Sequence, residues 1–280
     1  MDFKIVIDSG GEIPEDLRGT EQFVSVPLTL EVGSEQIIDD GHISQRELVA
    51  KIAACPTSPK TACPSPEAFY KEFSANQAEH IYAVTLSAEL SGSYQSAVIG
   101  MNMLLEEHPD TKIHVFNSRS ASVGETLVLL KIKELEESGC SFEEVIERTE
   151  QYISVKQTYF VLDNLETLRK NGRLSGVKAL AATMLKIKPI CIGNENGQIE
   201  QLDQARGMNK AIVKMVDHAA ERAGDASGRI LGISYVNCRD RAVMVRDAML
   251  SRVDAKESVV LQTGGLSTIY ANDGGVIVVI

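Results

Sequence analysis

Short apolar runs alternate with amphipathic stretches through the first half of the chain. The runs Phe3 to Ile7, His80 to Leu86 and Lys112 to Phe116 each end at a polar turn, which is typical of buried β-strands. Apolar residues recur at helical spacing in four other segments: Ser44 to Cys55, Pro66 to Gln77, Ser93 to Glu107 and Val123 to Ser138. This alternation predicts an α/β fold with an N-terminal, Rossmann-like parallel sheet that carries helices on both faces.

The segment Phe23 to Ile38 interrupts this order. Its apolar residues follow a period of two around Gly33-Ser34, a pair that suits a two-residue turn. We therefore expect a β-hairpin inserted into the N-terminal arrangement.

The pattern changes after about residue 157. It predicts helices over Phe160 to Leu174, Val177 to Leu185, Asn209 to Ala223 and Arg239 to Ser251. It predicts two strands within Ile187 to Glu200, around the turn Asn194 to Gly197, and further strands at Arg229 to Tyr235, Ser258 to Leu261 and Gly275 to Ile280. We expect an N-terminal domain over residues 1–157 and a C-terminal α+β two-layer sandwich over residues 158–280, with a cleft between them.

Composition limits the classes of partner. The chain has 280 residues, of which 44% are apolar and 24% charged, so it has enough apolar side chains for two cores. Its net charge is −11, and an acidic protein has no overall field that attracts phosphate backbones, so nucleic acid is not expected as a partner. The apolar run Ile5 to Ile7 is too short for a signal sequence or a membrane span, so we expect a cytoplasmic protein.

Several kinds of chemistry lack their sequence signatures. The five cysteines are scattered, without a Cys-x-x-Cys pair or a Cys/His cluster, so neither a disulfide framework nor a metal site is expected. The patterns G-x-x-x-x-G-K-[ST], G-x-G-x-x-G, H-E-x-x-H and G-x-S-x-G are all missing. Nucleotide-binding, zinc-peptidase and α/β-hydrolase functions therefore lose most of their support.

Polar turns follow the predicted strands, at the positions where ligands bind in open α/β sheets. The turn after the first strand contains Asp8 and Ser9, and a later one contains Ser118 and Arg119. Such side chains can line a cleft, or they can satisfy the backbone of their own turn.

Two further turns suit an anion more specifically. Thr61 lies four residues before Ser65, which can cap the next helix, so capping does not explain Thr61 and its hydroxyl can donate to an anion. Ser91-Gly92-Ser93 opens a helix and presents hydroxyls beside unpaired backbone N–H groups, an arrangement that binds a carboxylate or a phosphate. Simple capping by Ser91 or Ser93 is the alternative, and spacing alone does not separate the two.

One segment is basic although the chain is acidic. Residues 166–190 carry six cations and one anion, a net charge of +5, which leaves −16 for the remainder. Lys170 and Arg173 belong to this segment. Such a run is usually a solvated face, but beside a cleft it can dock a partner or balance an anionic ligand.

Taken together, these turns resemble the motifs of the DegV family of bacterial fatty-acid-binding proteins. The matching stretches occur in order over nearly the whole chain: Ile5 to Ser9, Thr61 to Ser65, Leu90 to Ala97, Asn117 to Ser122, Leu168 to Ser175 and Leu185 to Ile190. Six motifs in register are much more specific than one. The resemblance implies a lipid-binding protein, without a cofactor, whose two domains surround a buried tunnel for one long-chain fatty acid.

The resemblance also implies roles for individual residues. Thr61 and Ser93 would hydrogen-bond the fatty acid carboxylate, and Tyr270 occupies the place of a histidine that reaches the carboxylate in the family. A phenol can donate a hydrogen bond but does not become charged near neutral pH. The candidates for lining the cleft are Asp8, Ser9, Cys63, Ser91, Gly92, Ser118 and Arg119, and Cys63 replaces the family's usual glutamine.

For part of the family, the resemblance implies a role as the binding subunit of a fatty acid kinase. The protein would present the carboxylate to a separate ATP-dependent kinase subunit, which forms an acyl phosphate. Arg173, Arg206 and Lys170 are the candidates for docking that partner. Two alternatives stay open: a lipid buffer or sensor without a kinase, and a less favoured hydrolase with Ser91 or Ser93 as nucleophile, beside which the sequence places no histidine.

Overall fold

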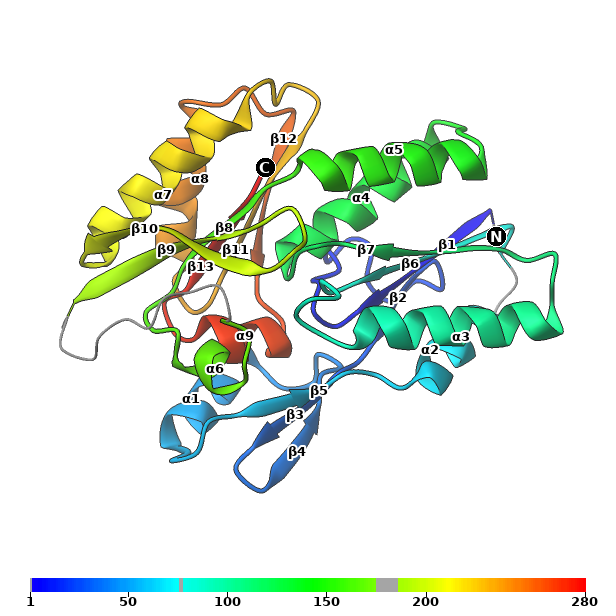
Figure 1. The fold of residues 1–280 in the computed structure, drawn as a ribbon, viewed down its shortest axis with the longest axis horizontal. Coiled ribbons are helices and arrows are strands. Elements are labelled where there is room, and N and C mark those ends of the chain that lie inside the picture. The colour runs from blue at the N-terminus through cyan, green and yellow to red at the C-terminus, as the bar shows by residue number, and fades with distance from the viewer. Residues whose placement is uncertain (1, 76–77, 175–185) are drawn as a thin grey trace.

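The computed structural model of the chain describes residues 2–75, 78–174 and 186–280. Two sheets lie next to each other with helices around them, and a small third sheet lies below both in the view of Figure 1. This α/β architecture confirms the predicted fold class. The helix expected over residues 177–185 lies outside the described residues.

The first sheet is parallel throughout, as predicted. Its strands follow the order β2-β1-β6-β7 and are β1 (Phe3–Asp8), β2 (Phe23–Val26), β6 (His80–Thr85) and β7 (Lys112–Asn117). The side chain of Val6 packs with α2 (Pro66–Ser74) and α3 (Ser93–Glu107), whereas Ile5 and Ile7 pack with α4 (Val123–Glu137) and α5 (Phe142–Val155). Helices thus cover both faces, and every residue of β1 is buried (Figure 1).

The predicted hairpin is shorter than expected. Strand β2 belongs to the parallel sheet, and the hairpin consists only of β3 (Thr29–Val32) and β4 (Glu35–Ile38), which turn at Gly33 with a φ of +67°. Pro27 separates β2 from β3, and since proline lacks an N–H group it cannot continue a ladder. Strand β5 (Lys60–Ala62) pairs with β3 and completes the small sheet, which packs near α1 (Gln45–Ala54).

The second sheet is mixed. Its strands follow the order β10-β9-β8-β13-β11-β12, and only β11 and β12 run parallel to each other: β8 (Thr158–Val161), β9 (Ile187–Gly193), β10 (Ile199–Arg206), β11 (Ile230–Tyr235), β12 (Glu257–Gln262) and β13 (Val276–Val279). Helices α7 (Met208–Ala223) and α8 (Arg239–Leu250) pack on one face through an apolar core.

The helix expected over Phe160 to Leu174 is wrong for most of its length. Residues Thr158 to Val161 form the buried strand β8, and only α6 (Glu166–Lys170) is helical. The residues of β8 are β-branched or aromatic, and their pairing with β13 and β9 in the middle of the sheet outweighs a weak helical pattern.

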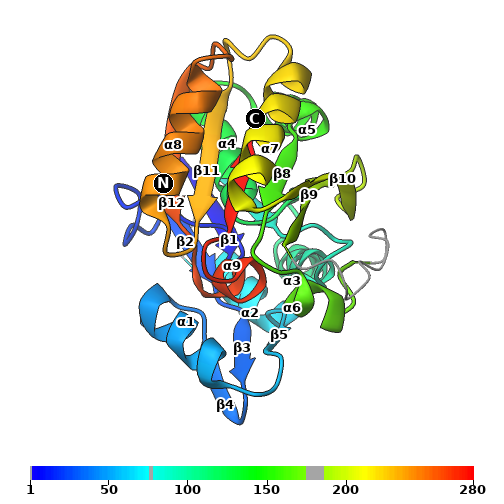
Figure 2. The same cartoon turned by 90° about the vertical axis from the view of Figure 1, so that its left-hand side faces the viewer.

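Two elements connect the sheets. Helix α4 packs against β1 and β6 of the first sheet and against β11 and β13 of the second. Helix α9 (Gly265–Ala271) lies between the second sheet and the small sheet, as Figure 2 shows, and packs on α1. Within the described residues, there is no helix of the length and hydrophobicity needed to cross a bilayer.

Close packing of α2 on α3 leads to a test of the fold. A β-carbon added at Gly100 would lie 2.7 Å from the carbonyl oxygen of Pro66. We expect Gly100→Ala to lower the free energy of unfolding by about 1–3 kcal/mol. The added methyl group would push α2 away from α3, and this costs more than the higher helix propensity of alanine gains. Urea titration measures the change, and Gly228→Ala, where nothing lies within 4 Å, is the control. Equal stability of the two variants would contradict this packing.

Candidate ligand-binding site

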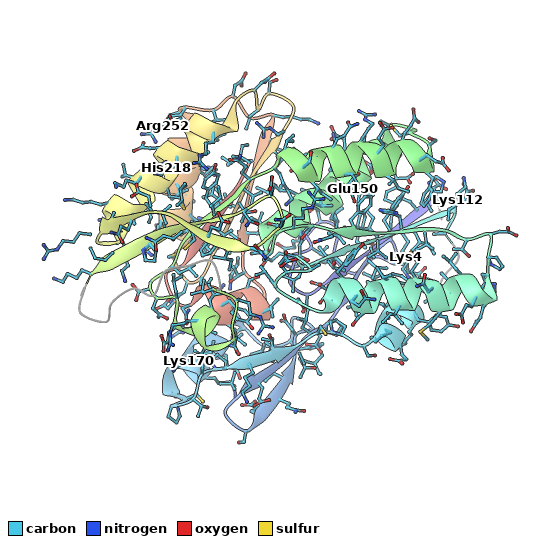
Figure 3. The ribbon with its side chains drawn as sticks, viewed as in Figure 1. Lys4, Lys112, Glu150, Lys170, His218 and Arg252 are labelled. Carbon is cyan, nitrogen blue, oxygen red and sulfur yellow. The ribbon has the colours of Figure 1, made fainter. Side chains whose placement is uncertain are left out.

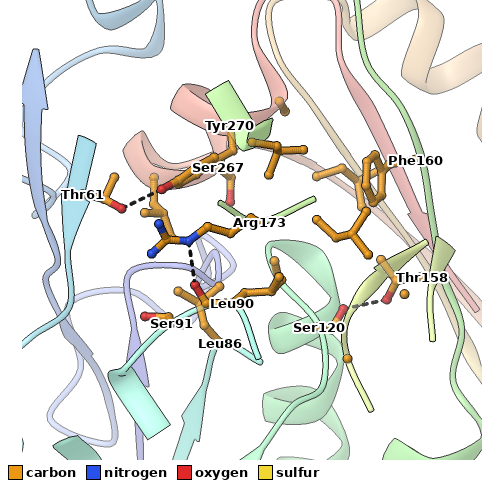
Figure 4. A pocket seen from close by; sticks show the side chains of 18 of the residues that line it. Thr61, Leu86, Leu90, Ser91, Ser120, Thr158, Phe160, Arg173, Ser267 and Tyr270 are labelled. Atoms are coloured by element: carbon orange, nitrogen blue, oxygen red, sulfur yellow. Dashed lines mark hydrogen bonds between the residues drawn. The ribbon is translucent and has the colours of Figure 1, made fainter. Parts of the chain in front are cut away.

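A cavity of about 320 Å³ lies between the two sheets, next to α6 and α9. Its walls are mainly aliphatic and aromatic and come from all three sheets and their loops, including Leu28, Leu86, Phe160, Leu162, Ile199 and Ile277. Figure 4 shows Thr61, Tyr270 and Arg173 at one end of the cavity and the Ser120 and Thr158 hydroxyls toward the other. The site is therefore an apolar chamber with polar groups at its ends.

Thr61 and Tyr270 meet at one end. The Thr61 hydroxyl, on β5, lies 2.9 Å from the phenol oxygen of Tyr270, on α9, and both side chains line the cavity. The two residues are 209 positions apart in the sequence. One hydroxyl hydrogen is used between them, so the other remains to donate to a ligand.

Ser91 and Gly92 also line this end, whereas Ser93 lies behind them. Ser93 begins α3, is fully buried, and its hydroxyl oxygen is 3.1 Å from that of Ser91. The Ser91 hydroxyl oxygen also accepts the backbone N–H of Ser93 at 3.2 Å. Of the two hydroxyls predicted to bind the carboxylate, that of Thr61 lines the cavity. That of Ser93 does not, and it contacts the cavity only indirectly, through the hydroxyl of Ser91.

Arg173 is half-buried and lines the cavity, and its part in docking a partner stays a prediction. Its Nε donates to the carbonyl of Leu90 at 3.1 Å, and its Nη1 donates to that of Asn171 at 2.5 Å. Arg206 and Lys170 are exposed, as expected of docking residues, and Lys170 lies 3.5 Å from Glu166 (Lys170 is labelled in Figure 3).

The other cleft candidates divide into two groups. Cys63 and Arg119 line the cavity, and Arg119 has a φ of +50°. Asp8, Ser9 and Ser118 do not line it, which contradicts the expectation for these three. Each of them instead forms hydrogen bonds inside the protein. Ser9 donates to Asp39, Ser118 forms hydrogen bonds with Ser120 within its own turn, and Asp8 accepts two backbone N–H groups.

Two buried carboxyls that the sequence did not single out hold α9 in place. Asp39 accepts the backbone N–H groups of Gly265 at 3.0 Å and Leu266 at 2.9 Å, and Glu12 accepts that of Gly264 at 3.2 Å. These contacts fix the first turn of the helix that carries Tyr270. They link residues more than 200 positions apart, so no local motif signals them.

The residues described at the site give little support to a serine-nucleophile or a metal-dependent reaction. No histidine lines the described cavity, so a serine nucleophile there would have no imidazole base. Among the described residues, no group of three or more His, Cys, Asp or Glu side chains is arranged to hold a metal ion. The arrangement is suited to binding an apolar chain with a polar head.

Comparisons with known proteins agree with this geometry. A family model described as the DegV family of uncharacterised proteins matches residues 2–280. A DegV domain-containing protein of Streptococcus pneumoniae is 36% identical over 99% of this chain and 98% of its own length.

Solved structures are similar over the whole chain. A DegV family protein of Ruminococcus gnavus, refined with vaccenic acid, is 49% identical with a TM-score of 0.97 and covers 100% of this chain and 99% of its own. The S. pneumoniae Fatty Acid Kinase (Fak) B3 protein, loaded with linoleic acid, is 34% identical with a TM-score of 0.87 and covers 100% and 99%.

The carboxyl of Glu12 makes the support of α9 sensitive to pH. Burial raises its pKa from 4.5 to about 7. The folded protein therefore binds this proton more tightly than the unfolded chain does. Ionisation of Glu12 lowers the free energy of unfolding, and this loss is absent at low pH, grows as pH rises from about 4.5, and is complete above about 7.

We expect Glu12→Gln to gain stability relative to the wild type by about 3 kcal/mol as pH rises through this window. Urea titrations between pH 4.5 and 8 measure the difference, and the exposed Glu15→Gln controls for the change in net charge. A difference that stays constant with pH would contradict the buried, proton-binding state of Glu12.

Proposed function

Because the chain belongs to the DegV family, whose model matches residues 2–280, we propose that it binds one long-chain fatty acid in the cavity between the two sheets. The observation that carries this proposal is the apolar chamber closed at one end by the Thr61–Tyr270 pair. The ligands named for the R. gnavus and S. pneumoniae structures, vaccenic and linoleic acid, support it.

The apolar walls supply most of the affinity. Burial of each CH₂ group is favourable by about 0.8 kcal/mol, so a chain of about 16 carbons gains roughly 10 kcal/mol before ordering costs. The aliphatic and aromatic lining, with Phe160 and Ile277 deep in the second sheet, suits such a chain.

The polar end orients the head group. Thr61, Tyr270 and Ser91 offer hydroxyl donors, Ser93 supports Ser91, and Arg173 adds a cation whose Nε and Nη1 already serve backbone carbonyls. The phenol of Tyr270 is a neutral hydrogen-bond donor, and it replaces the family's histidine as a donor to the carboxylate. A carboxylate held mainly by neutral donors keeps its nucleophilic character.

The bound carboxylate is then presented to a separate kinase subunit. Its oxygen attacks the terminal phosphorus of ATP, giving an acyl phosphate and ADP, and this protein acts as the binding subunit, not as the enzyme that transfers phosphate. The name of the S. pneumoniae Fatty Acid Kinase B3 protein supports this step. Because the reaction consumes ATP, we place the protein in the cytoplasm.

Arg206 and Lys170 supply the docking surface for the kinase subunit. Both are exposed, and Arg206 ends β10. Cations at this surface would attract an acidic face of the partner, whereas Arg173 now belongs to the head-group end.

Native mass spectrometry of the purified protein tests lipid binding. We expect a co-purified fatty acid of about 14–18 carbons on the wild type and at least several-fold lower occupancy on Thr61→Ala and Ser93→Ala, because each loses a hydroxyl that serves the carboxylate. Thr57→Ala removes an exposed threonine near Thr61 and is the matched control. Equal occupancy in all four proteins would disprove the carboxylate assignment, and an empty wild type would disprove lipid binding.

A coupled assay with a purified fatty acid kinase subunit and ATP tests presentation. We expect Arg206→Glu to lower acyl phosphate formation about tenfold or more while leaving lipid occupancy unchanged, since the residue lies outside the cavity. Lys112→Glu, at the far end of the first sheet (Figure 3), is the charge-matched control. Lipid binding without any phosphorylation of the wild type would favour the buffer or sensor function.

A further inference from the structure

Two hydroxyl groups form a polar spot at the end of the cavity away from Thr61. Ser120, in the turn before α4, and Thr158, the first residue of β8, both line the cavity, and their side-chain oxygens lie 2.6 Å apart (Figure 4). The two residues are buried, with 4% and 9% of their surface exposed. Phe160 and Leu162, from the same strand and its end, belong to the same cavity wall and are apolar.

The hydrogen bond between Ser120 and Thr158 leaves one hydroxyl hydrogen unused. Each hydroxyl has one hydrogen to donate, and either oxygen can be the donor in this pair. Whichever of them donates, the hydrogen of the other has no acceptor among the residues that the structure describes. A buried donor without an acceptor costs free energy, so an oxygen atom of a ligand beside the pair would be stabilised there.

The two hydroxyls are not needed to hold the backbone on which they lie. The N–H group of Ser120 donates to the Ser118 hydroxyl at 3.1 Å, and the carbonyl of Ser120 accepts the N–H group of Ser87 at 2.8 Å. Thr158 is held in the second sheet by its pairing with Val279 of β13. The pair is therefore fixed in place before a ligand arrives, which reduces the entropy lost on binding.

A polar cavity adjoins this end of the chamber. Thr158, Arg119 and Gly193 line both the apolar chamber and a second cavity of about 270 Å³. The other walls of the second cavity are mostly polar and include the side chains of Lys156 and Glu200. The far end of the chamber is thus a place where a polar group on a ligand chain is more favourable than in a purely apolar tunnel.

We propose that the cavity is selective for long-chain fatty acids that carry a hydroxyl group on the half of the chain away from the carboxylate, and that Ser120 and Thr158 bind this hydroxyl. This inference rests on the proposed function, because it places the carboxylate at the Thr61–Tyr270 end. The oxygen of the ligand hydroxyl accepts the unused hydrogen, and its own hydrogen is donated to a lone pair of the pair. No covalent bond forms or breaks.

A ligand hydroxyl has opposite effects in a polar and in an apolar site. In a purely apolar tunnel it loses its hydrogen bonds to water and gains none, which weakens binding about tenfold. Beside Ser120 and Thr158 it exchanges those bonds for new ones and also satisfies the unused donor. We therefore expect the hydroxylated acid to bind the wild type about fivefold more tightly than the plain acid.

Competition between stearic acid and its 10-, 12- and 18-hydroxy derivatives tests this selectivity. The protein is incubated with equal concentrations of stearic acid and one derivative, both in excess. Native mass spectrometry then separates the two complexes by the mass of one oxygen atom and gives their ratio. We expect the wild type to bind at least one derivative about fivefold more than stearic acid, and the position of its hydroxyl shows which carbon lies beside the pair.

The double variant Ser120→Ala/Thr158→Val removes both hydroxyls with little change in shape. It is expected to reverse the preference, so that it binds stearic acid about tenfold more than the same derivative. Thr149→Val is the matched control, since Thr149 is a fully buried threonine on α5 that lines neither of the two cavities. It should keep the preference of the wild type.

Thermal unfolding shows whether each variant is folded. If the double variant does not fold, Ser120→Ala and Thr158→Val as single variants should each lower the preference about threefold. A wild type that prefers none of the derivatives to stearic acid, or an unchanged preference in the folded variants, overturns the hydroxyl site and leaves the proposed function intact. A folded wild type that binds neither stearic acid nor any derivative overturns both.

Discussion

Burial of α4 between the two sheets is the constraint on which the site depends. Residues such as Val123 and Leu127 are shielded from solvent by β1 and β6 on one side and by β11 and β13 on the other. The turn that leads into α4 contains Ser120 and Ala121, and both line the cavity. The helix thus joins the sheets on one side and leaves, at its beginning, the space that a ligand can fill.

The head-group end combines local and distant contributions. Ser91 and Gly92 are placed by the strand–turn–helix unit of β6 and α3, as in many ligand sites of α/β proteins. Tyr270 is placed by buried carboxyls that come from the other end of the chain. Hydroxyl groups and the Arg173 side chain therefore line this end of the cavity, while the carboxyls of Glu12 and Asp39 lie one layer further inside and hold α9.

Much of this could be predicted from the sequence, because strongly periodic segments and strand-end turns are local signals. The parallel sheet and the turn at Gly33 follow from patterns that lie within a few residues of each other. The closeness of Thr61 and Tyr270, which are 209 positions apart, does not follow from any local pattern; only the family resemblance assigned both residues to one ligand. The local pattern failed for β8, where pairing decided the structure. It also left open whether Asp8 and Ser9 line a cleft or hydrogen-bond within their surroundings, and only the folded structure shows the second arrangement.

The last strand in the sequence, β13, occupies a central position in the second sheet, between β8 and β11. Strands β8 and β11 therefore cannot be joined within this sheet until Val276–Val279 has paired with both of them. Contacts between segments this far apart also slow folding, since long loops must close first. Ile277 of β13 lines the hydrophobic chamber, so the chamber is complete only after this long-range pairing has formed.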